Sequence, residues 1–110
     1  MSTAIQTGLA ERLRISEREW GIVAEILAAH LAGRTVWAFG SRATGKRVKR
    51  FSDLDLAIGG RLSSRERADL NEAFDEALIN FKVDVVEKEL VDADFWERIE
   101  KEFVVLQGGG

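Results

Sequence analysis

The sequence predicts a small α/β fold of the α+β type, in which a three-stranded mixed sheet is flanked by helices. Two Ser-x-x-Glu capping boxes, at Ser16 and Ser63, each stand before a run of apolar residues at helical spacing. Three short stretches rich in apolar and β-branched residues alternate with these helical segments. A chain of 110 residues has room for one domain, so these elements must share one layered core.

The first helix is expected over residues 16–32, with Ser16 as its N-cap and Gly33 at its end. Its inward stripe consists of Trp20, Val23, Leu27 and Leu31, with Ile22 and Ile26 beside it. Residues 1–15 carry no sustained pattern. We therefore expect a loose N-terminal lead-in over residues 1–15 and the folded domain over residues 16–107.

Three strands are expected, over residues 35–39, 53–58 and 81–87. A helix over residues 63–80 joins the second strand to the third, and its length suits a right-handed crossover between parallel strands. The inward side of this helix is expected to carry Leu70, Phe74, Ala77 and Leu78. The shorter connection between the first two strands suits an antiparallel pair.

A final helix is expected to begin at Asp92 or Asp94 and to run to about residue 106. Its apolar residues recur at helical steps and are Phe95, Ile99, Phe103 and Leu106. The predicted sheet would then have three strands and two open edges. Open edges are one hint that a partner covers part of the protein.

Composition excludes several classes of protein. The chain has no cysteine, which excludes a disulfide scaffold, a thiolate metal site and a cysteine nucleophile. Its one histidine, His30, excludes a histidine-cluster metal site. No apolar run reaches the ~18 residues of a membrane span, and no signal-peptide core is present, so we expect a cytoplasmic protein without membrane contact. The net charge of −3 argues against direct binding to nucleic acid.

Carboxylates and a glycine turn are expected to meet at one end of the sheet. Gly40 and Ser41 follow the first strand, while Asp53 and Asp55 stand at the start of the second. In an antiparallel pair these two ends lie side by side, and Asp84 on the third strand should lie at a similar level. Crowded carboxylates are neutralised by hard cations, so we expect a Mg²⁺ or Mn²⁺ site that handles phosphoryl groups.

Two other interpretations of these residues remain open at this point. Asp53 and Asp55 could line the exposed face of a half-buried strand, and Asp84 could be an ordinary exposed carboxylate. Residues 40–46 also fit G-x-x-x-x-G-K, the pattern of a P-loop. However, Arg47 stands where a P-loop has Ser or Thr, and the segment leaves no room for the long helix that follows a P-loop.

Three segments together resemble the signature of the minimal nucleotidyltransferases, members of the DNA polymerase β-like nucleotidyltransferase superfamily. They are Gly40-Ser41-Arg42-Ala43-Thr44-Gly45, Ser52-Asp53-Leu54-Asp55-Leu56-Ala57-Ile58 and Lys82-Val83-Asp84-Val85-Val86. The family pattern is Gly-Ser, a short loop, Asp-hydrophobic-Asp, and a third carboxylate on a later strand. The resemblance spans residues 16–106 and implies a polymerase β-like fold.

The resemblance also implies a role for each matching position. Gly40 and Ser41 would hold the triphosphate of ATP. Asp53, Asp55 and Asp84 would be the catalytic, metal-binding carboxylates, and Asp84 would also help to activate the attacking hydroxyl. The resemblance leaves two roles open for Arg42, which could contact phosphate or anchor the loop. Many relatives carry a second arginine where this chain has Thr44, so contacts to the triphosphate would be fewer here.

Small members of this family resemble the antitoxins of two-gene modules whose toxin is a HEPN-domain RNase. The resemblance implies transfer of AMP from ATP to a tyrosine hydroxyl of that toxin, in a complex of the two proteins. Two alternatives remain open. One is a non-catalytic antitoxin or binding subunit that neutralises its partner by occlusion. The other is a nucleotidyltransferase that acts on a small molecule or on RNA.

Overall fold

A computed structural model of the chain describes residues 8–49 and 51–108. Its sheet has the strand order β3-β2-β1-β4, with β1 antiparallel to both β2 and β4, and β2 parallel to β3. The strands are β1 (Val36–Phe39), β2 (Leu54–Ile58), β3 (Val83–Glu87) and β4 (Val104–Gln107). The α/β class and the mixed sheet are therefore confirmed, as are the antiparallel first pair and the parallel crossover pair.

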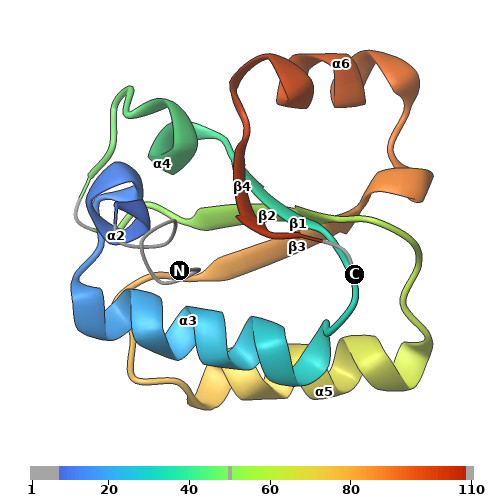
Figure 1. Cartoon of the computed structure of the whole chain (residues 1–110), viewed down its shortest axis with the longest axis horizontal. Helices are drawn as coiled ribbons and strands as arrows, with labels where there is room; N and C mark the ends of the chain where they lie inside the picture. The colour runs from blue at the N-terminus through green and yellow to red at the C-terminus, as the bar shows by residue number, and fades with distance from the viewer. Residues whose placement is uncertain (1–7, 50, 109–110) are drawn as a thin grey trace.

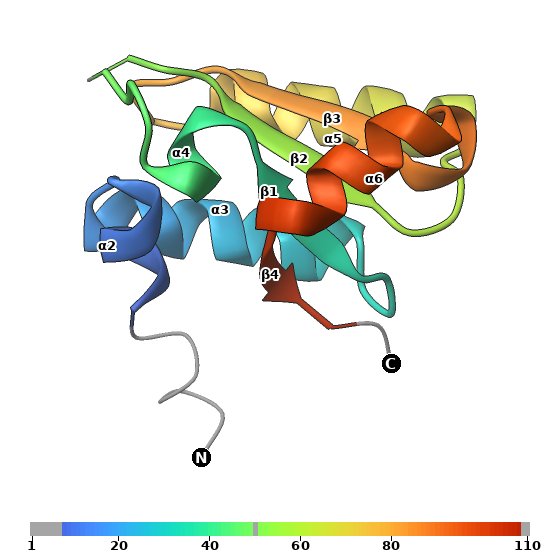
Figure 2. The same ribbon diagram turned by 90° about the horizontal axis from the view of Figure 1, so that it is seen from above.

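Helices cover both faces of this sheet (Figure 1). On one face lie α3 (Glu17–His30) and α5 (Ser64–Glu76), which pack against each other. On the other lie α4 (Ser41–Thr44) and α6 (Ala93–Glu102), and a view from above shows these two helices nearer the viewer than the sheet (Figure 2). A short 3₁₀ turn, η1 (Lys88–Leu90), leads from β3 to α6. None of the helices in the described ranges has the length and apolarity needed to cross a membrane.

Both predicted capping boxes are present. Ser16 and Ser63 each accept the backbone N–H of the glutamate three residues on, at 3.0 Å, and that glutamate accepts the backbone N–H of the serine. The predicted stripe of the first helix is buried, which confirms it, and with strand residues it forms the core between the sheet and the α3/α5 layer. The fully buried members on both sides of that core include Val23, Leu27, Leu31, Val36, Leu54, Leu56 and Ile58.

Helix α5 ends earlier than the sequence predicts. It stops at Glu76, Ala77 takes an extended conformation, and Leu78 is 79% exposed, so the prediction that Leu78 faces inward is wrong. Three residues further on, Phe81 is buried in the core. The backbone N–H of Asn80 then donates to the Glu19 carboxylate at 3.2 Å, which ties the connecting segment to α3.

The N-terminal segment is more ordered than predicted. Leu9–Leu13 form a helix, α2, with Ala10 and Leu13 completely buried, so the expectation of a loose lead-in is wrong for these residues. Arg14, at φ 62°, reverses the chain after α2 and lets this helix pack on α3. A helix of five residues is too short to show a periodic pattern. The rest of the predicted lead-in, residues 1–7, lies outside the described residues.

The last helix is also shorter than predicted, and a fourth strand takes its place. Asp92 caps α6 through the N–H of Phe95, and α6 ends at Glu102. Val104 and Leu106 are buried whereas Val105 is half exposed, which is the alternation of a strand. The predicted helix to residue 106 and the three-stranded sheet are therefore wrong at this point. The cause is a tertiary contact: β4 pairs with β1 and so provides hydrogen-bond partners for the backbone groups along an edge of β1 that would otherwise be open.

Aromatic contacts hold α6 on the sheet. Trp37 of β1 meets Trp96 edge to face, with ring centroids 4.9 Å apart, and it stacks on Phe103 at 5.8 Å. The residue before Trp96, Phe95, meets Phe39 with ring centroids 5.9 Å apart and an interplanar angle of 88°. These contacts fix α6 over the end of β1, beside the segment that carries the Gly-Ser turn.

Candidate active site

The turn after β1 lies close to the carboxylate of Asp55. Gly40 lies between Phe39 and α4 with φ +78°, a conformation that favours glycine. A Cβ built on Gly40 would lie 2.5 Å from Oδ2 of Asp55, closer than any real contact. Ser41 then begins α4 and is only partly exposed. The glycine therefore allows the Gly-Ser backbone and the Asp55 carboxylate to share one small space.

Two aspartates lie side by side on the sheet at this turn. Asp55 on β2 is in register with Phe39 on β1 and with Asp84 on β3, so these three side chains project from the same face. Burial, as the largest cause, and the charges of Asp84 and Asp53 together raise the pKa of Asp55 to about 6. Asp53 precedes β2 and is exposed. Asp55 and Asp84 therefore lie on neighbouring strands at the same level, as predicted. Asp53 lies just outside β2 and is more exposed than either of them.

The carboxylates at this turn could supply some, but not all, of the ligands of a hard divalent cation. Within residues 8–49 and 51–108, no three acidic or histidine side chains stand close enough to form a complete metal-binding cluster. The paired carboxylates Asp55 and Asp84, with Asp53 near them, nevertheless match the oxygen ligands that Mg²⁺ and Mn²⁺ prefer. Mg²⁺ in phosphoryl-transfer sites is commonly held by one or two carboxylates, with water and substrate phosphates supplying the rest. The residues present fit such a shared site.

Arg42 is a structural anchor in this fold. It is only 1% exposed, its Nε donates to the carbonyl of Ser52 at 2.9 Å, and its Nη1 donates to the carbonyls of Leu13 and Arg14 at 3.0 and 2.9 Å. The ring of Phe81 lies 5.0 Å from the guanidinium carbon. Arg42 thus joins α2, α4, the loop before β2 and the segment before β3. Of the two roles left open by the sequence, this geometry favours anchoring over phosphate contact.

Replacing Arg42 with lysine should therefore destabilise the fold. An ammonium cannot reach the three carbonyls at once, and buried carbonyls would lose their donor, so we expect a loss of about 2–4 kcal/mol in the free energy of unfolding. Chemical denaturation measures it, with Arg65→Lys on the exposed face of α5 as the control. A variant as stable as the wild type that binds triphosphate tenfold more weakly would show instead that Arg42 serves the phosphates.

A cavity of about 350 Å³ opens beside the Gly-Ser turn. It lies between the end of β1, α4 and α6, so its walls join two consecutive elements to a helix that is far from them in sequence. Its lining is mainly apolar and consists of Phe39, Gly40, Thr44, Phe95, Arg98, Ile99 and Glu102. Gly40 belongs to this wall, and a Cβ on it would meet the Asp55 carboxylate, so the cavity lies next to the carboxylate site.

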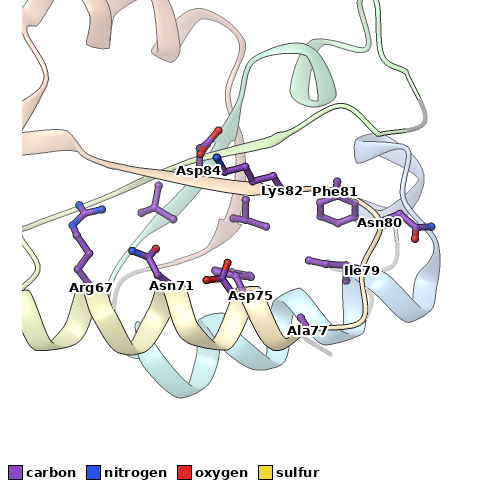
Figure 3. A pocket seen from close by; sticks show the side chains of 12 residues that line it. Arg67, Asn71, Asp75, Ala77, Ile79, Asn80, Phe81, Lys82 and Asp84 are labelled. Atoms are coloured by element: carbon purple, nitrogen blue, oxygen red, sulfur yellow. The ribbon is translucent and has the colours of Figure 1, made fainter.

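A larger cavity, of about 680 Å³, lies between α5 and β3 on the other side of the sheet (Figure 3). Asn71 and Asp75 project into it from α5, whereas Asp84 and Lys82 point away from α5. The Asp84 carboxylate therefore faces the side of α4 and α6, where Asp55 and Gly40 lie. Asp84 is one of the residues that line the larger cavity, whereas none of the described residues that line the smaller one is an aspartate. The smaller cavity is nevertheless the one that lies beside Gly40, on the side of the sheet to which the Asp84 carboxylate points.

Apart from Gly40 and Thr44, the sequence did not single out the residues that line this smaller cavity as site residues. Phe39 is the last strand residue before Gly40, and its register with Asp55 puts it on the carboxylate face. Phe95 and Arg98 are three residues apart and so share one face of α6, where the guanidinium carbon lies 5.7 Å from the ring centroid. The i, i+3 spacing is visible in the sequence, but its orientation toward Gly40 depends on how α6 crosses the sheet.

Comparison with known proteins shows the family of this chain. Residues 23–108 match the family described as polymerase beta, nucleotidyltransferase. A protein of Haemophilus influenzae named "Probable protein adenylyltransferase MntA" is 43% identical over 98 residues, which cover 87% of this chain and 85% of the relative.

Solved structures share the fold at lower identity. One is a crystal structure of a toxin–antitoxin with AMP-PNP, with 21% identity, a TM-score of 0.65, and coverage of 81% of this chain and 73% of that one. Another is a tri-AMPylated Shewanella oneidensis HEPN toxin in complex with MNT antitoxin, with 18% identity, a TM-score of 0.60, and coverage of 81% and 69%. The match over most of the chain and the 43% identity confirm what the Gly-Ser and Asp-x-Asp segments predicted: this chain belongs to the polymerase β family of nucleotidyltransferases.

Proposed function

We propose that this protein transfers AMP from ATP to a hydroxyl group of a partner protein and acts as the antitoxin to that partner. The 43% identity to the Haemophilus influenzae protein named as a probable protein adenylyltransferase is the observation that carries this proposal. The site supports it independently, because a glycine turn and paired carboxylates suit a nucleoside triphosphate. The protein would work in the cytoplasm, where ATP is plentiful.

Each site residue has a proposed role. Gly40 and Ser41 hold the triphosphate, whose oxygens can approach the turn because Gly40 has no Cβ. Asp53, Asp55 and Asp84 hold Mg²⁺ or Mn²⁺. The cation, when bound, neutralises the carboxylates and the charge on the phosphates. Arg42 supports the turn from below through its bonds to three backbone carbonyls.

The reaction is a single displacement at phosphorus. The acceptor oxygen forms a bond to the α-phosphorus of ATP, the bond from that phosphorus to the bridging oxygen of the β-phosphate breaks, and pyrophosphate leaves. Asp84 takes up the proton of the acceptor hydroxyl. This residue is on β3, an edge strand of the sheet, so a hydroxyl from another protein can reach it from the open side.

The acceptor is proposed to be a tyrosine of a HEPN-domain RNase toxin. A structure that shares this fold contains a tri-AMPylated HEPN toxin bound to an MNT antitoxin, which supports a partner of this class. In this proposal the partner protein presents the hydroxyl to the carboxylate site.

The test uses ATP labelled at the α-phosphate, Mg²⁺ and the protein encoded by the adjacent gene. We expect label on the partner with wild type and with Asp69→Asn, whose carboxylate lies on the exposed face of α5. Asp53→Asn should abolish the labelling and remain folded. If the wild type forms a tight complex but no label reaches the partner, the enzymatic proposal fails and the protein neutralises by occlusion.

A further inference from the structure

We infer that the cavity between β1, α4 and α6 is the binding site for the adenine base of ATP, with Phe95 as its principal aromatic contact. This inference rests on the proposed function for the identity of the nucleotide. It assigns a role to a cavity and to residues of α6 that the family pattern of Gly-Ser and aspartates leaves without one.

The position of the cavity carries the first part of the argument. Gly40 lines the cavity, and a Cβ built on it would lie 2.5 Å from Oδ2 of Asp55, so the carboxylate is close to this turn. A triphosphate held at Gly40 and Ser41 therefore has its nucleoside end within reach of the cavity. The volume of about 350 Å³ is at the lower end of the range of about 300–1,000 Å³ that small-molecule sites occupy, which suits part of a nucleotide.

The chemistry of the walls carries the second part. Phe39 and Phe95 are both partly exposed, and their rings stand at 88° to each other. Two rings at right angles form an apolar corner in which a flat base can lie against one ring and meet the other. The guanidinium of Arg98, an exposed residue, lies near the Phe95 ring and offers a second planar surface for stacking, one that carries positive charge. Purine bases bind to aromatic and guanidinium surfaces of this kind.

The placement of α6 makes the corner rigid. Trp96 is the neighbour of Phe95, and it is fixed against Trp37 on the sheet. Ile99, one turn further on, is 4% exposed and closes the floor of the cavity. Because Trp96 and Ile99 are both packed, the Phe95 ring is presented beside Gly40 before any ligand arrives, which lowers the entropy cost of binding.

The test compares two ligands, ATP and inorganic tripolyphosphate, by calorimetric titration with Mg²⁺ and without any acceptor protein. Phe95→Leu keeps an apolar side chain of similar size but removes the aromatic face. We expect its Kd for ATP to rise about tenfold and its Kd for tripolyphosphate to stay within twofold, since only ATP has a base to stack. Phe103→Leu is the matched control: Phe103 stacks on Trp37 outside the cavity, and both affinities should be unchanged.

A second pair of variants repeats the test without touching Phe95. Phe39→Leu should likewise raise the Kd for ATP and leave the Kd for tripolyphosphate unchanged. If Phe95→Leu does not fold, this variant tests the inference in its place. Arg98→Gln should raise the Kd for ATP by a smaller factor, whereas Arg65→Gln on α5 should leave the Kd for ATP unchanged.

The inference is overturned if the cavity variants bind ATP with the same Kd as the wild type, or if their Kd values for ATP and for tripolyphosphate rise by the same factor. It is also overturned if the wild type binds no ATP. Failure of the proposed function would look different. ATP would still bind with an affinity that depends on Phe95, but no label would reach the partner protein.

Discussion

Asp55→Asn is expected to remove AMP transfer almost completely and, at the same time, to make the metal-free protein more stable at neutral pH. The asparagine cannot supply the negative charge that the cation and the phosphates require, which is worth several kcal/mol at the transition state. A loss of about a thousandfold in the rate of transfer follows from about 4 kcal/mol. The measurement is the initial rate of labelling of the partner.

The gain in stability has an electrostatic cause. The Asp55 carboxylate is half buried and lies beside Asp84 and Asp53, and its pKa in the folded protein is raised to about 6 from the ordinary value of 3.8. At pH 7 its charge therefore works against folding. After a discount for solvent screening, the cost is about 1 kcal/mol, which corresponds to about 4 °C in Tm for a domain of this size.

The stability difference between Asp55→Asn and the wild type should shrink as the pH falls. Above about pH 6, Asp55 is charged in both the folded and the unfolded chain, and Asp55→Asn has its full advantage. As the pH falls from about 6 toward 4, the folded wild type takes up a proton at Asp55 before the unfolded chain does, so its stability approaches that of the variant. Thermal unfolding in EDTA at pH 7, 5 and 4 follows this convergence. A difference that grows as the pH falls would contradict the assignment.

The matched control is Asp69→Asn, which removes one carboxylate from the exposed face of α5. Its ion pair with Arg65 is a surface contact of little energetic value, so transfer and Tm should both stay close to wild type. If Asp55→Asn kept its transfer activity while Asp69→Asn did too, the site proposed here would be in the wrong place.

Gly40→Ala is expected to disrupt the site and the fold around it. The added Cβ would lie 2.5 Å from Oδ2 of Asp55, and the φ of +78° is itself strained for any residue with a side chain. Relief of the clash requires the Asp55 carboxylate or the turn to move. We expect a loss of about 2–3 kcal/mol in the free energy of unfolding and a fall in transfer of at least about a hundredfold.

Gly21→Ala provides the control for this substitution. Gly21 lies in α3, and a Cβ there meets no atom within 4 Å. Alanine in the middle of a helix is favoured over glycine by about 0.5–1 kcal/mol, so this variant should be slightly more stable and fully active. Denaturation curves and labelling rates of both variants separate the cost of the Gly40 contact from that of adding a methyl group. Equal effects of the two substitutions would refute the steric argument.

The family and the carboxylate pair could be predicted from the sequence because they depend on local spacing. Alternation places Asp53 and Asp55 on one face of a strand, and a helical crossover of suitable length predicts that β2 and β3 are parallel. Those two facts bring Asp84 beside Asp55, as observed. The capping boxes at Ser16 and Ser63 are likewise local, since each closes its hydrogen bonds within four residues.

Other features were decided by contacts between distant segments. Val104–Gln107 form a strand because β1 offers an open edge, although Phe103 and Leu106 continue the helical spacing. Leu9–Leu13 form a helix because Leu13 is buried in the core and its carbonyl accepts a hydrogen bond from Arg42. Neither the edge nor the donor can be seen in a local pattern.

By itself, the sequence determined the chemistry of this protein: a glycine turn, carboxylates on neighbouring strands, and hence a nucleotidyltransferase. The tertiary structure alone decided that Arg42 supports the turn, that Asp53 stays exposed while Asp55 is half buried, and that Phe39 and Phe95 form one wall of a cavity. The physical reason is that burial and contact depend on how α2, α6 and β4 pack around the site. Residue type and spacing constrain those contacts but do not specify them.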